Sequence, residues 1–199
     1  MSLKNPLGDF EITDPQAMRA LAHPVRLAAL SYLQRHGPAT ATQLSTAVGA
    51  SPSVTSWHLR HLSGFGLVVD EPAPDGDKRH RYWRAVARGF RFEMPDSPEG
   101  QAAGRLLRTE MMTEALEQTG RWLAEVEPEI EEPWTRVAGS SNTRVRITTD
   151  ELRRIQESVE ELLAPFVHRA EAEIPPDARS VRLIRFGLPA AAEPEGAAE

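Results

Sequence analysis

Hydroxyl, aromatic and guanidinium side chains recur at helical spacing a quarter of the way along the chain. Ser53, Ser56, Trp57 and Arg60 fall on one face of a helix expected from Pro52 to about Ser63. Serine hydroxyls can bond a phosphate or a base edge, the arginine fork matches guanine, and an apolar ring can touch a thymine methyl. These side chains suit contact with double-stranded DNA, although solvation and local packing are the alternative, which Trp57 alone favours.

Closely spaced helix starts and stops divide residues 13–63 into short helices that would position this face. The signals before residue 40 are a capping segment at Thr13-Asp14-Pro15-Gln16, a break at His23-Pro24, a leucine stripe at Leu27, Leu30 and Leu33, and a stop at Gly37-Pro38. The prolines suit first helical turns because their missing N–H would have no partner there. Two helices are therefore predicted before residue 37.

A second pair of helices follows, joined by a tight turn. Thr42 is the expected N-cap of the first, and Leu44 and Val48 lie on one face of it. Gly49 can turn the chain at positive φ, and Ser51-Pro52 opens the next helix. Two short helices in this arrangement predict a helix-turn-helix whose second helix enters the major groove. Val54, His58, Leu59 and Leu62 are expected to face the body of the domain.

A β-hairpin is predicted directly after these helices. The expected strands are 67–70 and 81–86, with a turn signal at Asp75-Gly76-Asp77 between them. Its returning side carries the basic residues Lys78, Arg79, His80 and Arg81. Charge runs are usually solvated faces, but the position beside the predicted DNA helix favours contact with phosphates. A helix-turn-helix with such a hairpin is a winged helix.

Several stretches resemble the ArsR-type winged-helix transcriptional regulators. They are AMRALAHPVRLAAL at residues 17–30, QLSTAVG at 43–49, SPSVTSWHLRHL at 51–62 and GLV at 66–68. The resemblance covers roughly residues 13–92, and it implies a homodimeric, effector-controlled DNA-binding regulator, with a reader helix at 52–63 and a wing at 70–86. The resemblance implies DNA contacts from Ser51, Ser53, Ser56, Trp57, His58 and Arg60 on the reader helix, and from Lys78, Arg79, His80, Arg81 and Tyr82 on the wing. Thr42, Gln43 and His61 are also expected to contact DNA.

Metal sensing, which founding members of that family carry out through cysteines or through ligands on a C-terminal helix, is not expected here. The chain contains no cysteine, and residues 99–132 contain no histidine. His58 and His61 diverge on the reader helix. We therefore expect no metal site and no cofactor, and control by an unidentified small-molecule effector or a partner.

The two halves of the chain differ in charge. Residues 1–92 hold 11 Lys and Arg against seven Asp and Glu, whereas residues 93–199 hold 12 against 22. A basic module joined to an acidic one suits a nucleic-acid reader with a separate assembly domain.

A long helix is predicted from about Glu99, after a linker marked by Pro95 and Pro98. Its apolar stripe either packs on the winged domain or pairs with a second subunit, and the symmetry of operator DNA favours the dimer. The expected dimer residues are Leu107, Met111, Leu116 and Trp122.

A small strand-helix-strand module is predicted at residues 136–188. Its strands are 144–148 and 180–186, and Thr148 to Glu151 forms a capping box for the helix between them. Four arginines lie on the strands, and either they bind an anionic effector or, as the simpler account, they pair with acidic residues of the helix. The strand arginines are Arg144, Arg146, Arg182 and Arg185, and the acidic residues of the helix are Glu151, Glu157, Glu160 and Glu161.

The predicted fold is thus α+β and mainly α. Its parts are a flexible N-terminus at 1–12, a winged helix-turn-helix domain at 13–92, a linker and dimerisation helix at 93–135, the module at 136–188 and a disordered tail at 189–199. No enzyme motif with a nucleophile, phosphate loop or metal pair is present, so an enzyme is not expected. A protein-interaction module is the more serious alternative. No stretch is apolar enough to span a membrane or to form a signal peptide, so a cytoplasmic location is expected.

Overall fold

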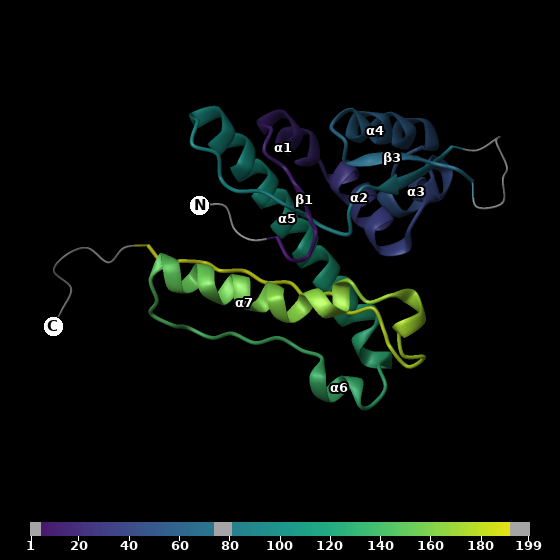
Figure 1. The fold of residues 1–199 in the computed structure, drawn as a ribbon. Helices are drawn as coiled ribbons and strands as arrows, with labels where there is room; N and C mark the ends of the chain where they lie inside the picture. The colour runs from purple at the N-terminus through teal and green to yellow at the C-terminus, as the bar shows by residue number, and fades with distance from the viewer. Residues whose placement is uncertain (1–4, 74–80, 192–199) are drawn as a thin grey trace. The chain divides into compact units, whose positions relative to one another are not determined.

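The computed structural model describes residues 5–73 and 81–191 (Figure 1). The chain divides into two compact units, one of Gly8–Ser141 and one of Met1–Leu7 with Asn142–Glu199. The described residues are mainly helical, with two small sheets. None of their helices combines the length and apolarity that crossing a bilayer requires.

Helices α1, α2, α4 and α5 of the unit Gly8–Ser141 begin where the sequence signals place them, whereas the start of α3 differs and α6 was not predicted. They are α1 (Pro15–Leu21), α2 (Pro24–His36), α3 (Ala41–Val48), α4 (Pro52–Gly64), α5 (Pro98–Glu125) and the short α6 (Trp134–Val137), with a 3-10 turn at Glu127–Glu129. A proline opens α1, α2, α4 and α5, and the side chains of Asp14, Ser51 and Ser97 cap α1, α4 and α5. The two helix pairs predicted between residues 13 and 63 are confirmed.

The cap of α3 differs from the prediction. Thr40 is the N-cap, and Thr42 lies inside the first turn. The Thr40 N–H donates to Gln43 Oε1 at 2.8 Å, and the Gln43 N–H donates to Thr40 Oγ1 at 3.2 Å. Gln43, three residues after Thr40, completes a capping box that Thr42 cannot form. At the other end of α3, Gly49 adopts the left-handed conformation with φ of 65°, which turns the chain into α4.

A three-stranded antiparallel sheet lies beside these helices. Its strands are β2 (Ala39–Thr40), β4 (Tyr82–Ala85) and β3 (Val68–Glu71), in that order. Val68 pairs with Ala85 and Glu71 with Tyr82, so the predicted hairpin is confirmed, while β2 was not predicted. The predicted turn and the basic residues Lys78, Arg79 and His80 lie outside the described residues.

The N-terminal segment is ordered where the sequence predicted flexibility. β1 (Phe10–Glu11) pairs in parallel with β5 (Phe90–Arg91), and Ile12 is buried. The Phe10 N–H donates to the Gly89 carbonyl at 3.0 Å, and the Ile12 N–H donates to the Arg91 carbonyl at 2.9 Å. Burial of Ile12 and these backbone bonds fix the segment, so the prediction for residues 1–12 is wrong from Phe10 onward; residues 1–4 lie outside the described part.

One hydrophobic core joins α1 to α4, the three-stranded sheet and the first half of α5. Its largest fully buried side chains are Met18, Leu21, Leu27, Leu30, Leu44, Leu59, Leu62, Val68, Trp83 and Leu107. Leu107 therefore packs within its own subunit, so its assignment to a dimer interface is wrong. α5 belongs to this unit and is not a separate segment; Arg19 of α1 and Glu99 of α5 form an ion pair at 2.8 Å.

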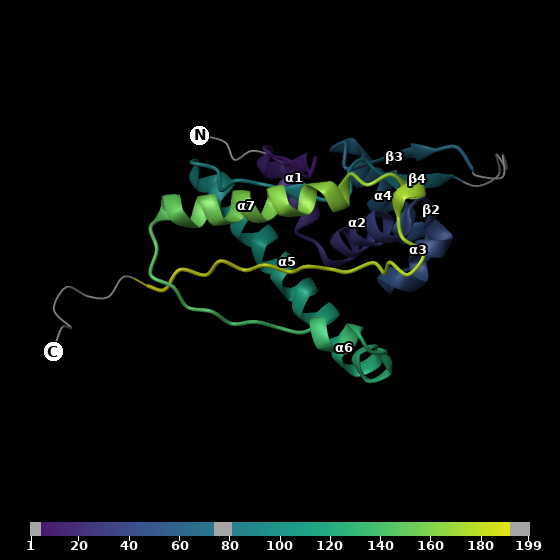
Figure 2. The ribbon, with the colours of Figure 1, turned by 60° about the horizontal axis from the view of Figure 1, so that its bottom comes forward.

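The second unit consists of α7 (Thr149–Val167), a 3-10 turn at Glu171–Glu173 and irregular segments (Figure 2). The capping box at Thr148 and Glu151 is confirmed, with the Thr148 N–H donating to Glu151 Oε2 at 2.7 Å. The strands predicted at 144–148 and 180–186 are wrong, because neither segment joins a sheet. An alternating sequence favours an extended backbone, but a strand also needs a neighbour with which to exchange hydrogen bonds. Residues 189–191 carry no regular structure, and the rest of the predicted tail lies outside the described residues.

Candidate nucleic-acid interface

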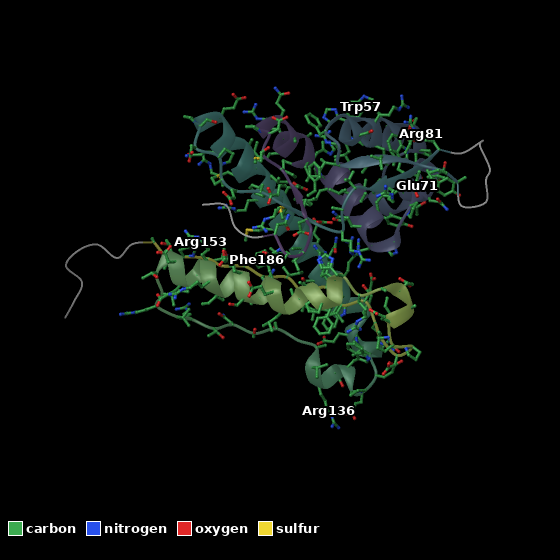
Figure 3. All side chains as sticks on the ribbon, viewed as in Figure 1. Trp57, Glu71, Arg81, Arg136, Arg153 and Phe186 are labelled. Carbon is green, nitrogen blue, oxygen red and sulfur yellow. The ribbon has the colours of Figure 1, made fainter. Side chains whose placement is uncertain are left out.

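The two faces of α4 separate as their side-chain chemistry requires. Thr55, His58, Leu59 and Leu62 are buried against the body of the unit. The opposite face carries Ser51, Ser53, Ser56, Trp57 and Arg60, all exposed except the half-buried Ser56 (Figure 3, where Trp57 is labelled). Because Ser51 and Pro52 fix the start of the helix, this polar face has a defined orientation on a rigid element.

Two predicted orientations on α4 are corrected. Val54, expected to face inward, is 46% exposed, and Thr55 is buried in its place. Thr55 can be buried because its hydroxyl donates to the Ser51 carbonyl at 2.9 Å, which satisfies its polar atom. His58, expected among the DNA-contacting residues, is buried, so it supports the exposed face from beneath.

The exposed polar side chains bond to one another along the helix. The hydroxyls of Ser51 and Ser53 are 3.1 Å apart, and Arg60 Nη2 donates to Ser56 Oγ at 3.0 Å. The latter contact uses one of the five guanidinium N–H groups and restricts the rotamers of a long side chain. Arg60 is thereby held in place while it retains donors for an acceptor outside the protein.

Aromatic and imidazole rings support the exposed face of α4. The Trp57 ring stacks on His61, with centroids 5.6 Å apart and an interplanar angle of 13°, and it meets His58 edge-on at 4.9 Å. His61 in turn contacts the edge of Phe65, with centroids 5.4 Å apart. Trp57 is 55% exposed, so one side of the indole packs on the protein while the rest stays open to a ligand.

A group of positive or protonatable side chains lies beneath this layer. His23, at the start of α2, contacts His58 with ring centroids 4.7 Å apart. Burial lowers the pKa of His23, His58 and His61, and the like charge of Arg26 lowers each of them further. Arg26 is buried, and its Nε donates to the Ala20 carbonyl. The spacing of residues in the sequence placed His23 only next to α2. Its contact with His58 depends on how α2 packs on α4, and local spacing does not reveal that packing.

The hairpin strands carry local ion pairs. Arg81 forms a bidentate pair with Asp70, and Arg84 Nε lies 2.8 Å from Glu71 Oε2. The hydrogen bond with Asp70 raises the pKa of Arg81, whose guanidinium carbon also lies 4.3 Å from the centre of the Trp83 ring. The described strands are therefore close to neutral, and the charge predicted to meet phosphates resides mainly in Lys78, Arg79 and His80, outside the described residues.

The remaining predicted contact residues take varied positions. Thr42 and Gln43 are exposed on α3, where Gln43 also completes the cap of that helix; His61 is half-buried, and Tyr82 is half-buried in β4. In residues 5–73 and 81–191, no three His, Asp or Glu side chains are grouped so that they could hold a metal ion.

A second surface lies on α5. Of the predicted dimer residues, Met111 packs at the edge of the core, Trp122 is half-buried, and Leu116 is 65% exposed. Leu116 belongs to a row of exposed, uncharged residues spaced alternately three and four apart: Leu106, Thr109, Thr113, Leu116, Gly120 and Leu123. We call this row the α5 seam. Most of this row was not predicted from the sequence, because Leu107 and Met111 form a competing apolar stripe on the same helix.

Comparison with known proteins agrees with the geometry of this region. A family model described as a helix-turn-helix domain matches residues 21–71, from the last residue of α1 to the end of β3. A search of curated proteins found no match. Residues 21–71 of this chain are therefore a helix-turn-helix domain, the kind of module that DNA-binding regulators use.

Proposed function

We propose that this protein is a sequence-specific DNA-binding transcriptional regulator of the winged helix-turn-helix type, not an enzyme. In this proposal α4 lies in the major groove and the β3–β4 hairpin lies on the phosphate backbone. The observation that carries the proposal is the exposed face of α4, where Arg60 is held by Ser56 within a matched helix-turn-helix domain. Arginine placed in this way can form two hydrogen bonds with a guanine.

The remaining side chains fit the same role. Ser51 and Ser53 stand at the N-terminus of α4, where their hydroxyls and the positive end of the helix dipole favour a phosphate. The exposed part of Trp57 offers an apolar surface to a thymine methyl. The excess of Lys and Arg in residues 1–92 provides the long-range attraction that DNA binding needs.

We also propose that the regulator is a homodimer that binds a palindromic operator. The α5 seam supports this, because spacing of three and four residues is that of two helices packed side by side, and Leu106, Leu116 and Leu123 supply its apolar knobs. A two-fold dimer places two α4 helices about one turn of DNA apart. Such a dimer acts as a repressor when its operator overlaps a promoter, and an unidentified small-molecule effector would regulate its occupancy.

A gel-shift assay tests the proposal. Purified full-length protein is titrated onto the DNA upstream of its own gene in the presence of excess random DNA. Retention of the upstream fragment at protein concentrations that leave random DNA free supports the proposal. Equal binding to both DNAs, or to neither, contradicts it, and the second outcome favours a helix-turn-helix domain that binds a protein instead.

A further inference from the structure

The unit that contains α7 has no core of its own. None of the described residues between 142 and 191 is buried, in contrast to the many fully buried side chains of the unit Gly8–Ser141. A 19-residue helix in water is only marginally stable unless an apolar face packs on something. The α7 unit therefore needs another surface against which its apolar side chains can pack.

The apolar face of α7 identifies where that partner belongs. Leu152, Ile155, Val159, Leu162, Leu163 and Phe166 recur at intervals of three and four residues along the helix. Leu162 is 70% exposed and Phe166 is 63% exposed, and Ile155 is also exposed. An open groove bordered by Ile147, Glu151, Arg154, Ile155, Ser158 and Val159 continues this face toward the segment that precedes the helix. Leu152, Val159 and Leu163 are half-buried, so the face is open to solvent at Ile155, Leu162 and Phe166. Exposed apolar side chains spaced along one helix face mark an interaction surface.

Two segments with strand-like sequences accompany this helix. Residues 144–148 read Arg-Val-Arg-Ile-Thr, residues 180–186 read Ser-Val-Arg-Leu-Ile-Arg-Phe, and neither joins a sheet. The C-terminal segment runs back along α7 in Figures 1 and 2, whereas residues 144–148 lead directly into the start of the helix. The second comes close to the helix at Gly187, where an added Cβ would lie 3.6 Å from Leu152 Cδ1. Val145, Val181 and Leu183 are exposed, as expected of strands whose neighbours are missing.

We propose that residues 142–188 are one half of a two-copy domain. The segments 144–148 and 180–186 of one chain pair edge to edge with those of a second copy of the same chain. The exposed apolar face of α7 then covers the sheet that results. This arrangement satisfies both unmet requirements at once, because it gives the strands their hydrogen-bonding neighbours and gives the helix a surface to pack on.

The distribution of charge favours a second copy over a charged partner of another kind. Residues 142–191 hold eight arginines and eight acidic residues, so this unit has no net charge that would select a strongly acidic or basic partner. Within it the charges are segregated. The two strand-like segments carry four arginines and no acidic residue, whereas α7 carries five acidic residues and two arginines. A unit with basic strands and an acidic helix is complementary to itself across a two-fold axis.

This inference goes beyond the proposed function: like the proposed homodimer it needs a second copy of the chain, but it rests neither on DNA binding nor on the α5 seam. The α5 seam and the exposed face of α4 belong to the unit Gly8–Ser141. DNA binding is measured separately, so DNA binding could fail while the two-copy domain stands, and the reverse is equally possible.

Amide hydrogen exchange of the full-length protein, read by mass spectrometry, tests the proposal. Backbone amides of 144–148 and 180–186 should exchange roughly 100-fold or more slowly than a random coil at micromolar concentration, where sedimentation shows more than one copy. Dilution to concentrations at which sedimentation shows monomers should abolish the protection. Protection that persists in the monomer would mean that the same chain covers the segments, which contradicts the proposal. Exchange at the random-coil rate while the protein is a dimer contradicts it equally.

A pair of variants tests whether the amide protection depends on the segment 180–186. Leu183→Asp should remove the protection of both 144–148 and 180–186 and leave the amides of the unit Gly8–Ser141 unchanged. Val137→Asp is the matched control, because Val137 is 77% exposed on α6 and lies outside the proposed sheet; it should change neither. Retained protection in Leu183→Asp would overturn the proposal.

Discussion

The imidazole rings of His23 and His58 lie 4.7 Å apart between centroids, and the Nδ1 atom of each is buried without a hydrogen-bond partner. This contact joins the first residue before α2 to the buried face of α4. Burial, with Arg26 close by, lowers the pKa of both histidines, so the fold favours the neutral form of both rings. The orientation of the proposed DNA-reading helix is thereby tied to the protonation of two histidines.

The first prediction concerns the pH dependence of stability. The pKa of His23, His58 and His61 is lower in the folded chain than the ordinary value of 6.5, so the unfolded chain binds more protons. The free energy of unfolding should therefore fall as the pH drops from about 7.5 to about 5.5. Urea unfolding at a series of pH values measures this slope. His58→Asn should reduce the slope, and a free energy of unfolding that rises on acidification would contradict the account.

The corrected cap of α3 gives the second prediction. Thr40→Ala removes the acceptor of the Gln43 N–H and should lower the free energy of unfolding by about 1 kcal/mol. Thr42→Ala is the matched control, because Thr42 is exposed inside the first turn, and it should cost less than about 0.5 kcal/mol. Chemical denaturation of both variants decides between the two caps. A larger loss from Thr42→Ala would restore the cap expected from sequence.

The third prediction separates the roles of two leucines on α5. Leu116→Asp should weaken the dimer by disrupting the contact between the two α5 helices, and should change the free energy of unfolding of the unit Gly8–Ser141 little, because Leu116 is exposed on the α5 seam. Leu107→Ala should instead lower that free energy by about 2–5 kcal/mol, because Leu107 is fully buried in the core. Sedimentation and urea unfolding of each variant distinguish these outcomes. A monomeric wild-type protein at micromolar concentration would reject the proposed dimer.

The fourth prediction concerns the hairpin. Arg79→Ala should weaken binding to all DNA sequences alike and make the slope of log K against log salt shallower by about 0.9 for each phosphate that the variant no longer neutralises. Binding titrations at several salt concentrations, on upstream and on random DNA, give the slope. An unchanged slope would show that Arg79 does not bind a phosphate, and weaker binding confined to one sequence would assign it to a base.

Short sequence motifs predicted most of the structural features that depend only on neighbouring residues, such as the starts of helices. Ser51-Pro52 and the Thr148–Glu151 box start helices within the segments that contain them, and no distant contact is needed to recognise either. Features that depend on distant partners escaped prediction. Phe10–Glu11 is a strand because Phe90–Arg91 lies beside it.

The candidate site shows the same division. Helical periodicity placed Ser53, Trp57 and Arg60 on the exposed face correctly. It did not reveal that Thr55 would be buried in place of Val54, because that exchange depends on a hydrogen bond from the threonine hydroxyl to the backbone. The alternating segments 144–148 and 180–186 have the composition of strands, yet composition does not say which chain provides the neighbouring strand.

The most direct test of the account is the affinity of Arg60→Ala for specific and random DNA, with Arg136→Ala as the control. Arg136 carries the same charge, is exposed on α6 and pairs with Glu132, away from α4 (Figure 3). Fluorescence anisotropy should show that Arg60→Ala loses about 1–3 kcal/mol on the upstream site and much less on random DNA, while Arg136→Ala matches the wild type on both. Equal losses on the two DNAs, or none on either, would contradict the central claim that α4 reads the DNA sequence.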